Sequence, residues 1–294
     1  MKAMVQEGYE GTESVGGIGI LHPGSMGAQV AAQARSTGAT VWWVAAGRSA
    51  QSRARAEEAG LLAVESLDEL AERCGLILSI CPPASALEVA GSVAATPFSG
   101  IYVDANAISP EHAIEVAALF DGRARVVDGG IVGGPPRKTG DSRLYLSGSD
   151  EEAVETVRAL FAQTVLETHV LPGPVGRASA LKLAFASFNK ISYLLAAQAF
   201  ALASGHGVLD ELLELAADKV PGTVLARPSR VTLAGPRAWR WAPEMQEIAA
   251  ACAAVGVPGD VAELASSVFL RWADLKGADD VTVEDLITGL TNGR

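Results

Sequence analysis

The sequence predicts an α/β protein with a doubly wound parallel sheet, followed by an all-α domain. Short apolar runs alternate with helical stretches from residue 15 to about residue 170. This alternation stops after Leu171-Pro172-Gly173, and only helical periodicity follows. The length agrees, because 294 residues fit two domains at about 150 residues each.

Short apolar runs in the first half predict buried strands. Gly, Pro, Ser or Arg bounds each run, and such strands separated by helices are typical of a parallel sheet covered on both faces. Ser66 and Glu69 have the spacing of a capping box, which marks the start of one intervening helix. The predicted strands are GIGIL, TVWWVAA, LLAV, LILSI and GIYVD, and the predicted helices span 26–37, 50–59, 67–73, 84–95 and 110–120.

The second half is predicted to be helical throughout. Residues 176–204 form one long predicted helix, which Gly205-His206-Gly207 ends. We divide the chain into a flexible tail at 1–14, a sheet domain at 15–172 and a helical domain at 173–294. The other predicted helices span 209–219, 243–255, 262–275 and 283–290.

Composition and charge exclude several classes of function. Lys and Arg number 23 against 34 Asp and Glu, and the net charge of −11 argues against binding to a nucleic-acid backbone. The apolar segment 191–203 is shorter than the about 20 residues that cross a bilayer, and the N-terminus has no signal-peptide pattern. We expect neither a nucleic-acid nor a membrane partner.

The cysteines and histidines predict no metal site. Cys74, Cys81 and Cys252 form no CxxC pair, which is typical of reduced thiols in a cytoplasmic protein. The four histidines are scattered, with no HExxH spacing.

A glycine-containing turn follows the first predicted strand. The sequence HPGSMG at 22–27 has the second and third glycines of a Gly-x-Gly-x-x-Gly dinucleotide turn, with His in place of the first. Pro disfavours helical geometry in the preceding residue, so we expect the turn to be built differently. An ordinary strand–helix turn is the alternative, and the missing Lys excludes an NTPase phosphate loop. The candidate cofactor-binding residues here are His22, Pro23, Gly24, Ser25, Met26 and Gly27.

The end of the second predicted strand favours NADP(H) over NAD(H). An NAD site places Asp or Glu about 20 residues after the glycines, where it holds the ribose hydroxyls. This strand runs instead into Arg48 and Ser49, with Arg53 on the next helix. A guanidinium and a hydroxyl suit a 2′-phosphate. The alternative is a solvated basic helix start.

Four motifs in order resemble the β-hydroxyacid dehydrogenases, which include 6-phosphogluconate and 3-hydroxyisobutyrate dehydrogenases and have imine reductases as relatives. HPGSMG resembles the family's G-L-G-x-M-G, and residues 104–110 (DANAISP) resemble D-x-S-T-x-x-P, with Asn106 in place of Ser. Residues 128–134 (DGGIVGG) resemble D-A-P-V-S-G-G. The catalytic motif follows as Gly173, Gly176, Ala178 and Lys182. The similarity is strongest to the bacterial 6-phosphogluconate-dehydrogenase-like branch, whose members carry HPG-x-MG and AGRS.

The resemblance implies a Rossmann domain for NADP(H) and a helical domain for the substrate. It adds Cys81, Pro82 and Asn106 as cofactor-binding residues. Gly133 stands where the family has a substrate-binding Ser, and Ala186 where it has Asn. The backbone amides of Gly133 and Gly134 are the candidate anion site that remains.

Lys182 is the candidate general acid or base. A lysine among small apolar residues is desolvated, which lowers its pKa towards the range of acid–base catalysis. Asn189 shares its helix face and is the second candidate catalytic and substrate-contacting residue. Because relatives that decarboxylate carry Glu at this position, the resemblance implies redox chemistry without decarboxylation. The alternative is a lysine that merely packs along its helix.

Trp241 is a candidate wall of the substrate pocket, although core or dimer packing is the commoner fate of such a residue. Relatives form dimers through the helical domain, and we expect a homodimer here. The predicted function is NADPH-dependent hydride transfer to or from a carbonyl or hydroxyl carbon of a small substrate. The alternatives are an imine reductase and a non-catalytic NADP-binding sensor.

Overall fold

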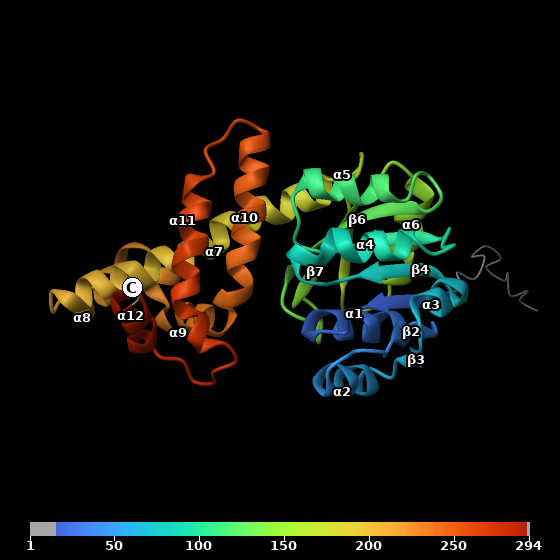
Figure 1. Ribbon diagram of the computed structural model, residues 1–294. Helices are drawn as coiled ribbons and strands as arrows, with labels where there is room; N and C mark the ends of the chain where they lie inside the picture. The colour runs from blue at the N-terminus through green and yellow to red at the C-terminus, as the bar shows by residue number, and fades with distance from the viewer. Residues whose placement is uncertain (1–15, 293–294) are drawn as a thin grey trace, which may run out of the picture.

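The protein consists of a sheet domain and a helical domain, which the long helix α7 (Arg177–Gly205) joins (Figure 1). The computed structural model describes residues 16–292, so the predicted tail at 1–14 lies outside the described residues. No helix within residues 16–292 is long and apolar enough to span a membrane.

The sheet has eight strands in the order β3-β2-β1-β4-β5-β6-β7-β8, and β1 to β6 run parallel. The chain order reverses between β1 and β4, which is the switch point where doubly wound sheets bind ligands. The predicted doubly wound parallel sheet is confirmed. The parallel strands are β1 (Gly17–Leu21), β2 (Val41–Val44), β3 (Leu62–Val64), β4 (Cys74–Ser79), β5 (Ile101–Asp104) and β6 (Arg125–Gly133).

Two further strands extend the sheet beyond β6. β7 (Ser142–Ser147) pairs antiparallel with β6, and β8 (Glu167–Val170) pairs parallel with β7. The pattern of apolar runs did not single out β6, β7 or β8. Glycines interrupt β6, and polar residues alternate with apolar ones in β7 and β8.

Both faces of the sheet are buried, as the apolar runs predicted. In β1, Ile18 and Ile20 enter one core, whereas Leu21 enters the core on the opposite face. α1 (Ser25–Ser36), α2 (Ala50–Glu58) and α6 (Glu151–Leu160) cover the first face. α3 (Leu67–Arg73), α4 (Ala86–Ala94) and α5 (Pro110–Leu119) cover the second, and the short helix η1 (Pro83–Ser85) precedes α4.

Polar side chains fix where several of these helices begin. The Ser66 hydroxyl accepts a hydrogen bond from the Glu69 N–H at 3.1 Å, which confirms the predicted start of α3. Ser49, Ser109 and Asp150 cap α2, α5 and α6 in the same way. These caps orient the helices that follow β2, β5 and β7.

The helical domain packs around the second half of α7. The whole helix has 29 residues and is therefore about 44 Å long. Its core includes Phe200 from α7, Met245 from α10 and Phe269 from α11. The domain contains α8 (Leu209–Lys219), η2 (Val224–Ala226), α9 (Pro228–Val231), η3 (Thr232–Arg237), α10 (Ala238–Ala254), α11 (Asp260–Phe269), η4 (Leu270–Leu275) and α12 (Val283–Asn292).

α10 begins earlier than predicted. The pattern placed its start at Pro243, whereas the helix starts at Ala238 and includes the proline. Proline removes one backbone hydrogen bond inside a helix. Because Pro243 lies in the second turn, the loss falls close to the helix end, and the burial of Trp241 and Met245 supports the turns around it.

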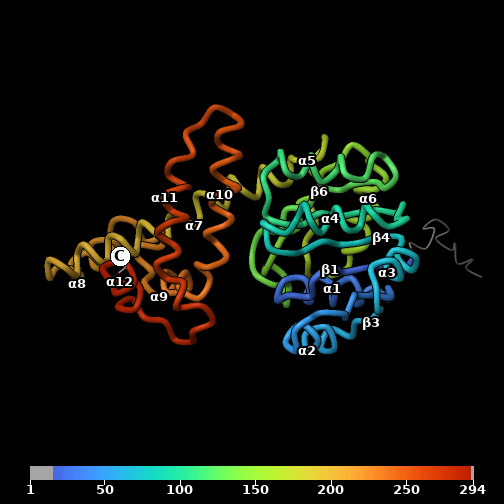
Figure 2. Tube along the Cα trace, viewed as in Figure 1, coloured from blue at the N-terminus to red at the C-terminus, as the bar shows by residue number. Residues whose placement is uncertain are grey.

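The two domains contact each other along α10 as well as through α7. In Figures 1 and 2, α10 stands between α11 and the sheet domain. The Glu247 carboxylate of α10 accepts hydrogen bonds from the Ser109 N–H at 2.7 Å and lies 2.8 Å from His112 Nδ1. Glu247 thereby ties α10 to the N-terminus of α5.

Candidate active site

The turn between β1 and α1 keeps the shape of a dinucleotide turn despite its histidine. His22 has a positive φ of 62°, the conformation that the missing glycine adopts readily. A Cβ on Gly27 would lie 2.7 Å from the His22 carbonyl oxygen, so the third glycine is needed for helix–strand packing. The expectation of a differently built turn is therefore wrong, because His tolerates positive φ better than most residues.

The His22 side chain is half-buried, and its Nδ1 has no hydrogen-bond partner within the described residues. Burial and the nearby Arg48 guanidinium lower the pKa of His22 to about 4. The imidazole is therefore neutral at physiological pH. In the same turn, Pro23 is buried, Met26 packs against the core and Ser25 is exposed.

Arg48, Ser49 and Arg53 lie together after β2 but in different roles. The Arg53 guanidinium donates to the Ala45 carbonyl at 2.8 Å and so braces the loop. The Ser49 hydroxyl caps α2 by accepting from the Ser52 N–H at 3.2 Å. The Arg48 backbone is paired with Ala45 and Arg53, but within residues 16–292 its guanidinium has no hydrogen bond or ion pair, which leaves it available to a ligand.

Asn106 connects the ends of β4 and β5. Its Nδ2 donates to Asp104 at 2.9 Å and to the Ser79 hydroxyl at 3.1 Å, while its Oδ1 accepts from the Cys81 N–H at 2.6 Å. Both amide protons are thus used inside the protein. Asn106 thus shapes the predicted cofactor edge, and its role in cofactor binding stays a prediction.

Burial changes the protonation of two groups at this edge. The pKa of Asp104 rises to about 7 because the carboxyl is desolvated, and its hydrogen bonds from Asn106 only partly oppose this effect. Desolvation and the nearby Asp104 raise the pKa of the Cys81 thiol to about 12. Cys81 is thus a protonated packing thiol, and Pro82 beside it is exposed.

Asp128 of β6 holds the N-terminus of α7. Its carboxylate accepts hydrogen bonds from the N–H groups of Gly176, Ala178 and Ser179 at 2.9 to 3.0 Å. It also accepts from the hydroxyls of Ser147 and Ser179. Asp128 belongs to a motif noted in the sequence, but its role was missed because its partners lie about 50 positions further along the chain.

Lys182 lies in the second turn of α7, where this helix crosses β6. A Cβ on Gly130 would come within 2.6 Å of the Ala178 carbonyl oxygen and 3.2 Å of the Lys182 Cβ, so glycine permits this close crossing. Burial lowers the pKa of Lys182, and the charges of Glu244, Asp104 and Asp128 act in the opposite direction. The site therefore places a desolvated lysine among carboxylates from both domains.

Lys190 and Glu244 form a buried ion pair between α7 and α10. Their side chains are 12% and 11% exposed, and Lys190 Nζ lies 5.5 Å from the centre of the Trp241 ring. Sequence reasoning missed Glu244, since no spacing rule links positions 190 and 244. The one available signal was that Glu244 stands three positions after Trp241 in the sequence.

Trp241 lies in the core of the helical domain. Its ring packs edge-on against Tyr193 at 5.8 Å and Phe269 at 5.5 Å. Only 9% of the residue is exposed, which fits the packing alternative, and its role as a pocket wall stays a prediction. Asn189 is half-buried on α7, and its carbonyl accepts from the Ser192 hydroxyl at 2.8 Å.

The backbone at Gly133 and Gly134 differs from the predicted anion cup. The Gly134 N–H donates to the Asp141 carbonyl at 3.0 Å, so this amide is already paired. Gly133 has a φ of 120°, and a Cβ there would lie 2.2 Å from the same carbonyl oxygen. The expectation that Gly133 replaces the family's Ser is corrected: Ser is the fifth residue of D-A-P-V-S-G-G, which is Val132 in this chain, and Gly133 aligns with a family glycine, as its positive φ favours.

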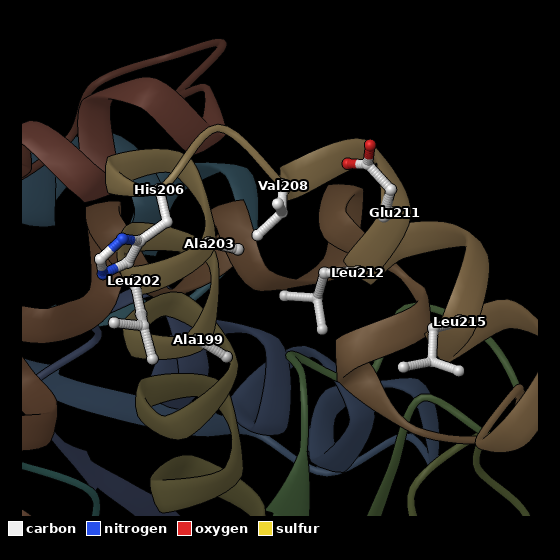
Figure 3. A pocket seen from close by; sticks show the side chains of 8 residues that line it. All are labelled: Ala199, Leu202, Ala203, His206, Val208, Glu211, Leu212 and Leu215. Atoms are coloured by element: carbon white, nitrogen blue, oxygen red, sulfur yellow. The ribbon is translucent and has the colours of Figure 1, made fainter.

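A separate apolar groove lies between α7 and α8 (Figure 3). Its volume is about 640 Å³, and it contains none of the candidate site residues. Residues 16–292 hold no cluster of three or more His, Cys, Asp or Glu that could bind a metal ion. The groove is lined by Ala199, Leu202, Ala203, His206, Val208, Glu211, Leu212 and Leu215.

Comparison with known families agrees with this architecture. The model of the NAD binding domain of 6-phosphogluconate dehydrogenase matches residues 14–169, more than half of the chain. The chain belongs to this dehydrogenase family. In the helical domain, residues 203–272 match a model described as a domain of unknown function, DUF1932. Membership identifies the domain that carries the HPGSMG turn as a dinucleotide-binding domain.

Solved structures share the fold over nearly the whole chain. The conserved protein MTH1747, of unknown function and described as similar to 3-hydroxyacid dehydrogenases, is 27% identical, with a TM-score of 0.67 over 88% of this chain and 97% of its own. *Mycobacterium tuberculosis* 3-hydroxyisobutyrate dehydrogenase, solved with L-serine, is 18% identical with a TM-score of 0.74 over 94% and 99%. The *Aspergillus terreus* reductive aminase, solved with NADPH, is 21% identical with a TM-score of 0.57 over 93% and 99%.

One curated relative also matches the chain. An uncharacterized 28.5 kDa protein of *Methanothermus fervidus* is 27% identical over 169 residues, which are 58% of this chain. The match spans 64% of that relative, less than two thirds of its length.

Proposed function

We propose that this protein is an NADPH-dependent oxidoreductase that transfers a hydride between the nicotinamide and a carbonyl or hydroxyl carbon of a small, 3-hydroxyacid-like substrate, without decarboxylation. The observation that carries the proposal is Lys182, a desolvated lysine where the dinucleotide-binding domain meets the helical domain. Family membership supports the reaction class. The resemblance to 3-hydroxyisobutyrate dehydrogenase supports the substrate class.

The turn after β1 fits the pyrophosphate of a dinucleotide. A Cβ on Gly24 would have no neighbour closer than 3.9 Å, so the loop is open on that side. The first turn of α1 has no side-chain cap, which leaves backbone N–H groups free for an anion. When bound, the cofactor supplies or accepts the hydride.

Lys182 would handle the proton. During reduction, its ammonium group donates a proton to the substrate oxygen as negative charge develops there. During oxidation, the neutral amine takes the proton of the hydroxyl group. A lowered pKa makes both forms accessible nearer neutral pH than for an exposed lysine. Asn189, on the same helix, would contact the substrate.

Arg48 supports a preference for NADPH. Its guanidinium has no partner within the described residues and lies near His22, where a 2′-phosphate would bind. Ser49 and Arg53 would hold the loop in shape, as their hydrogen bonds indicate.

The cofactor preference is tested by measuring the dissociation constants of NADPH and NADH by fluorescence titration. Loss of a charge-assisted contact in Arg48→Ala raises the NADPH constant about 10- to 100-fold and changes the NADH constant little. Arg35→Ala, in the last turn of α1, is the control. Equal affinity of the wild-type protein for both cofactors would contradict the preference.

An exposed apolar stripe on α7 supports a homodimer formed by the helical domain. Leu181, Phe185, Phe188, Leu195 and Leu202 follow heptad spacing on one helix face, and Phe188 is 79% exposed. In Figure 3, Leu202 lies at the groove between α7 and α8, so the groove continues the stripe. A second copy would cover both surfaces.

Light scattering after gel filtration tests the dimer. Phe188→Glu places a charge in the stripe and should give a monomer, whereas Val255→Glu, at an equally exposed position outside it, should stay dimeric. A monomeric wild-type protein would refute the dimer.

A substrate panel tests the reaction. Ketones, 3-oxoacids and cyclic imines are each mixed with NADPH, and NADPH oxidation is followed by absorbance. The proposal predicts turnover of carbonyl compounds. Turnover of imines alone would instead support the imine reductase, for which the reductase with NADPH is a structural precedent. NADPH binding without any turnover would support the sensor.

A further inference from the structure

The loop that follows β5 takes one of its hydrogen-bond acceptors from the helical domain. Residues 105–109 form this loop, which ends where α5 begins. Ser109 is only 1% exposed, and its backbone N–H donates to the Glu247 carboxylate of α10 at 2.7 Å. A buried N–H group that has no acceptor is costly, so the loop keeps this conformation only while α10 lies in place.

Glu247 does not act as the cap of α5. This helix has its own cap, because the Ser109 hydroxyl accepts a hydrogen bond from the His112 N–H at 3.1 Å. The Ser109 N–H lies before the first residue of the helix and is not part of it. The same Glu247 oxygen lies 2.8 Å from His112 Nδ1, which orients the carboxylate. The contact therefore holds the loop and not the helix.

The 105–109 loop carries Asn106, which shapes the predicted cofactor edge. Asn106 Oδ1 accepts from the Cys81 N–H at 2.6 Å, so the loops that follow β4 and β5 are joined to each other. α10 also contacts η1, the short helix that comes directly after Pro82. One helix of the helical domain thus meets both loops, at the edge where doubly wound sheets bind ligands.

The far end of the 105–109 loop is anchored inside the sheet domain. A Cβ on Gly176 would lie 3.3 Å from the Cβ of Pro110, so the first residue of α5 packs against the start of α7. Asp128 holds that start by accepting from the Gly176 N–H at 2.9 Å. Because Pro110 is anchored, a shift of Ser109 on loss of Glu247 is passed back along the loop towards Asn106.

We propose that Glu247 is a positioning residue, which holds the 105–109 loop from across the domain boundary and so places Asn106 and Cys81 for the cofactor. Cofactor binding by the sheet domain thereby depends on where the helical domain lies. The link to the cofactor rests on the proposed function, whereas the link between Glu247 and the loop does not.

Substitutions of Glu247 separate the reach of its side chain from its charge. Glu247→Ala removes the acceptor and should raise the dissociation constant of NADPH about tenfold. Glu247→Asp keeps the charge but is one methylene shorter, so it should weaken binding like Glu247→Ala. Glu247→Gln keeps the reach and an acceptor oxygen, and should stay within about threefold of the wild-type protein. Gln246→Ala, exposed on the same helix, is the control and should bind NADPH normally.

Hydrogen exchange tests the coupling without cofactor or substrate. NMR spectroscopy of the full chain follows the amide hydrogens of Ser109 and Cys81. In Glu247→Ala both should exchange at least about tenfold faster, because Asn106 joins Cys81 to the loop. Both should exchange at the wild-type rate in Gln246→Ala. Faster exchange at Ser109 alone would show a local contact and would overturn the proposal.

The two measurements distinguish this proposal from the proposed function. A wild-type protein that binds no NADPH contradicts the proposed function, and the exchange of Cys81 still decides whether Glu247 acts on this edge. Normal NADPH binding by Glu247→Ala and Glu247→Asp overturns the positioning role and leaves the proposed reaction intact. So does weak binding by Glu247→Gln with normal binding by Glu247→Asp. If Glu247→Ala does not fold, Glu247→Asp takes its place in both measurements.

Discussion

The two domains approach Lys182 with carboxylates of different kinds. In the sheet domain, Asp128 accepts hydrogen bonds from three backbone N–H groups and two hydroxyls, so its position is fixed. In the helical domain, Glu244 has Lys190 as its one hydrogen-bond partner among the described residues. The first carboxylate fixes the start of the helix that carries Lys182, and the second joins that helix to α10.

The largest effect is expected from removing the fixed carboxylate. Asp128→Ala leaves the N–H groups of Gly176 and Ser179 without their acceptor, while the Ala178 N–H keeps the Ser147 hydroxyl, and should lower the free energy of unfolding by about 4 kcal/mol. Urea denaturation followed by circular dichroism measures the loss. Asp150→Ala, an ordinary cap with one hydrogen bond at 2.9 Å, is the control and should cost about 1 kcal/mol. Equal losses would show that Asp128 is only another cap.

The buried carboxyl of Asp104 should make the stability of the protein depend on pH. Its pKa rises from 3.8 to about 7 on folding, so the folded state binds more protons between these values. Its contribution to stability therefore falls as pH rises from about 4 to about 7, by up to about 4 kcal/mol. Asp104→Asn should remove this decline from the unfolding free energy measured across that range.

His22→Asn provides a control of opposite sign. The pKa of His22 falls to about 4 on folding, so its contribution to stability rises as pH rises from about 4 to about 6.5. Removing it should steepen the decline that Asp104 causes. If the slope is the same in the wild-type protein and in Asp104→Asn, the buried carboxyl is not the source.

The smallest effect on stability is expected at Gly133, in the tight connection between β6 and β7. Gly133→Ser meets a φ of 120° and the Asp141 carbonyl oxygen, and should destabilise by about 2 kcal/mol. Gly134→Ser is the matched control, since a Cβ there has no neighbour within 4 Å. Equal midpoints in urea for the two variants would contradict the strained connection.

The sequence predicted local features of the fold well. The ranges predicted for α3 and α8 agree with the structure residue for residue, because Ser66 caps one and Gly207 precedes the other. β6 and β7 were missed, since their pairing and not their composition makes them strands. Pro243 misplaced the start of α10, because its effect on a helix depends on how the surrounding turns are packed.

The candidate site could be predicted only where its residues lie within one continuous sequence motif. Lys182 and the HPGSMG turn belong to motifs and could be found from the resemblance to the dehydrogenase family. The carboxylates Glu244 and Asp128 bond to α7 from positions about 50 residues away in the sequence, where no spacing rule could find them. Trp241 shows the converse limit, since a sequence pattern does not distinguish a pocket wall from a core residue.

The central claim is that Lys182 supplies the proton at a site that binds NADPH independently of it. The most direct test measures NADPH affinity and turnover together in Lys182→Ala, with a panel compound that the wild-type protein reduces. Affinity should stay within about threefold while the rate falls at least about 100-fold, and Lys138→Ala should match the wild-type protein in both. An unchanged rate in Lys182→Ala, or a loss explained wholly by weaker NADPH binding, would contradict the account.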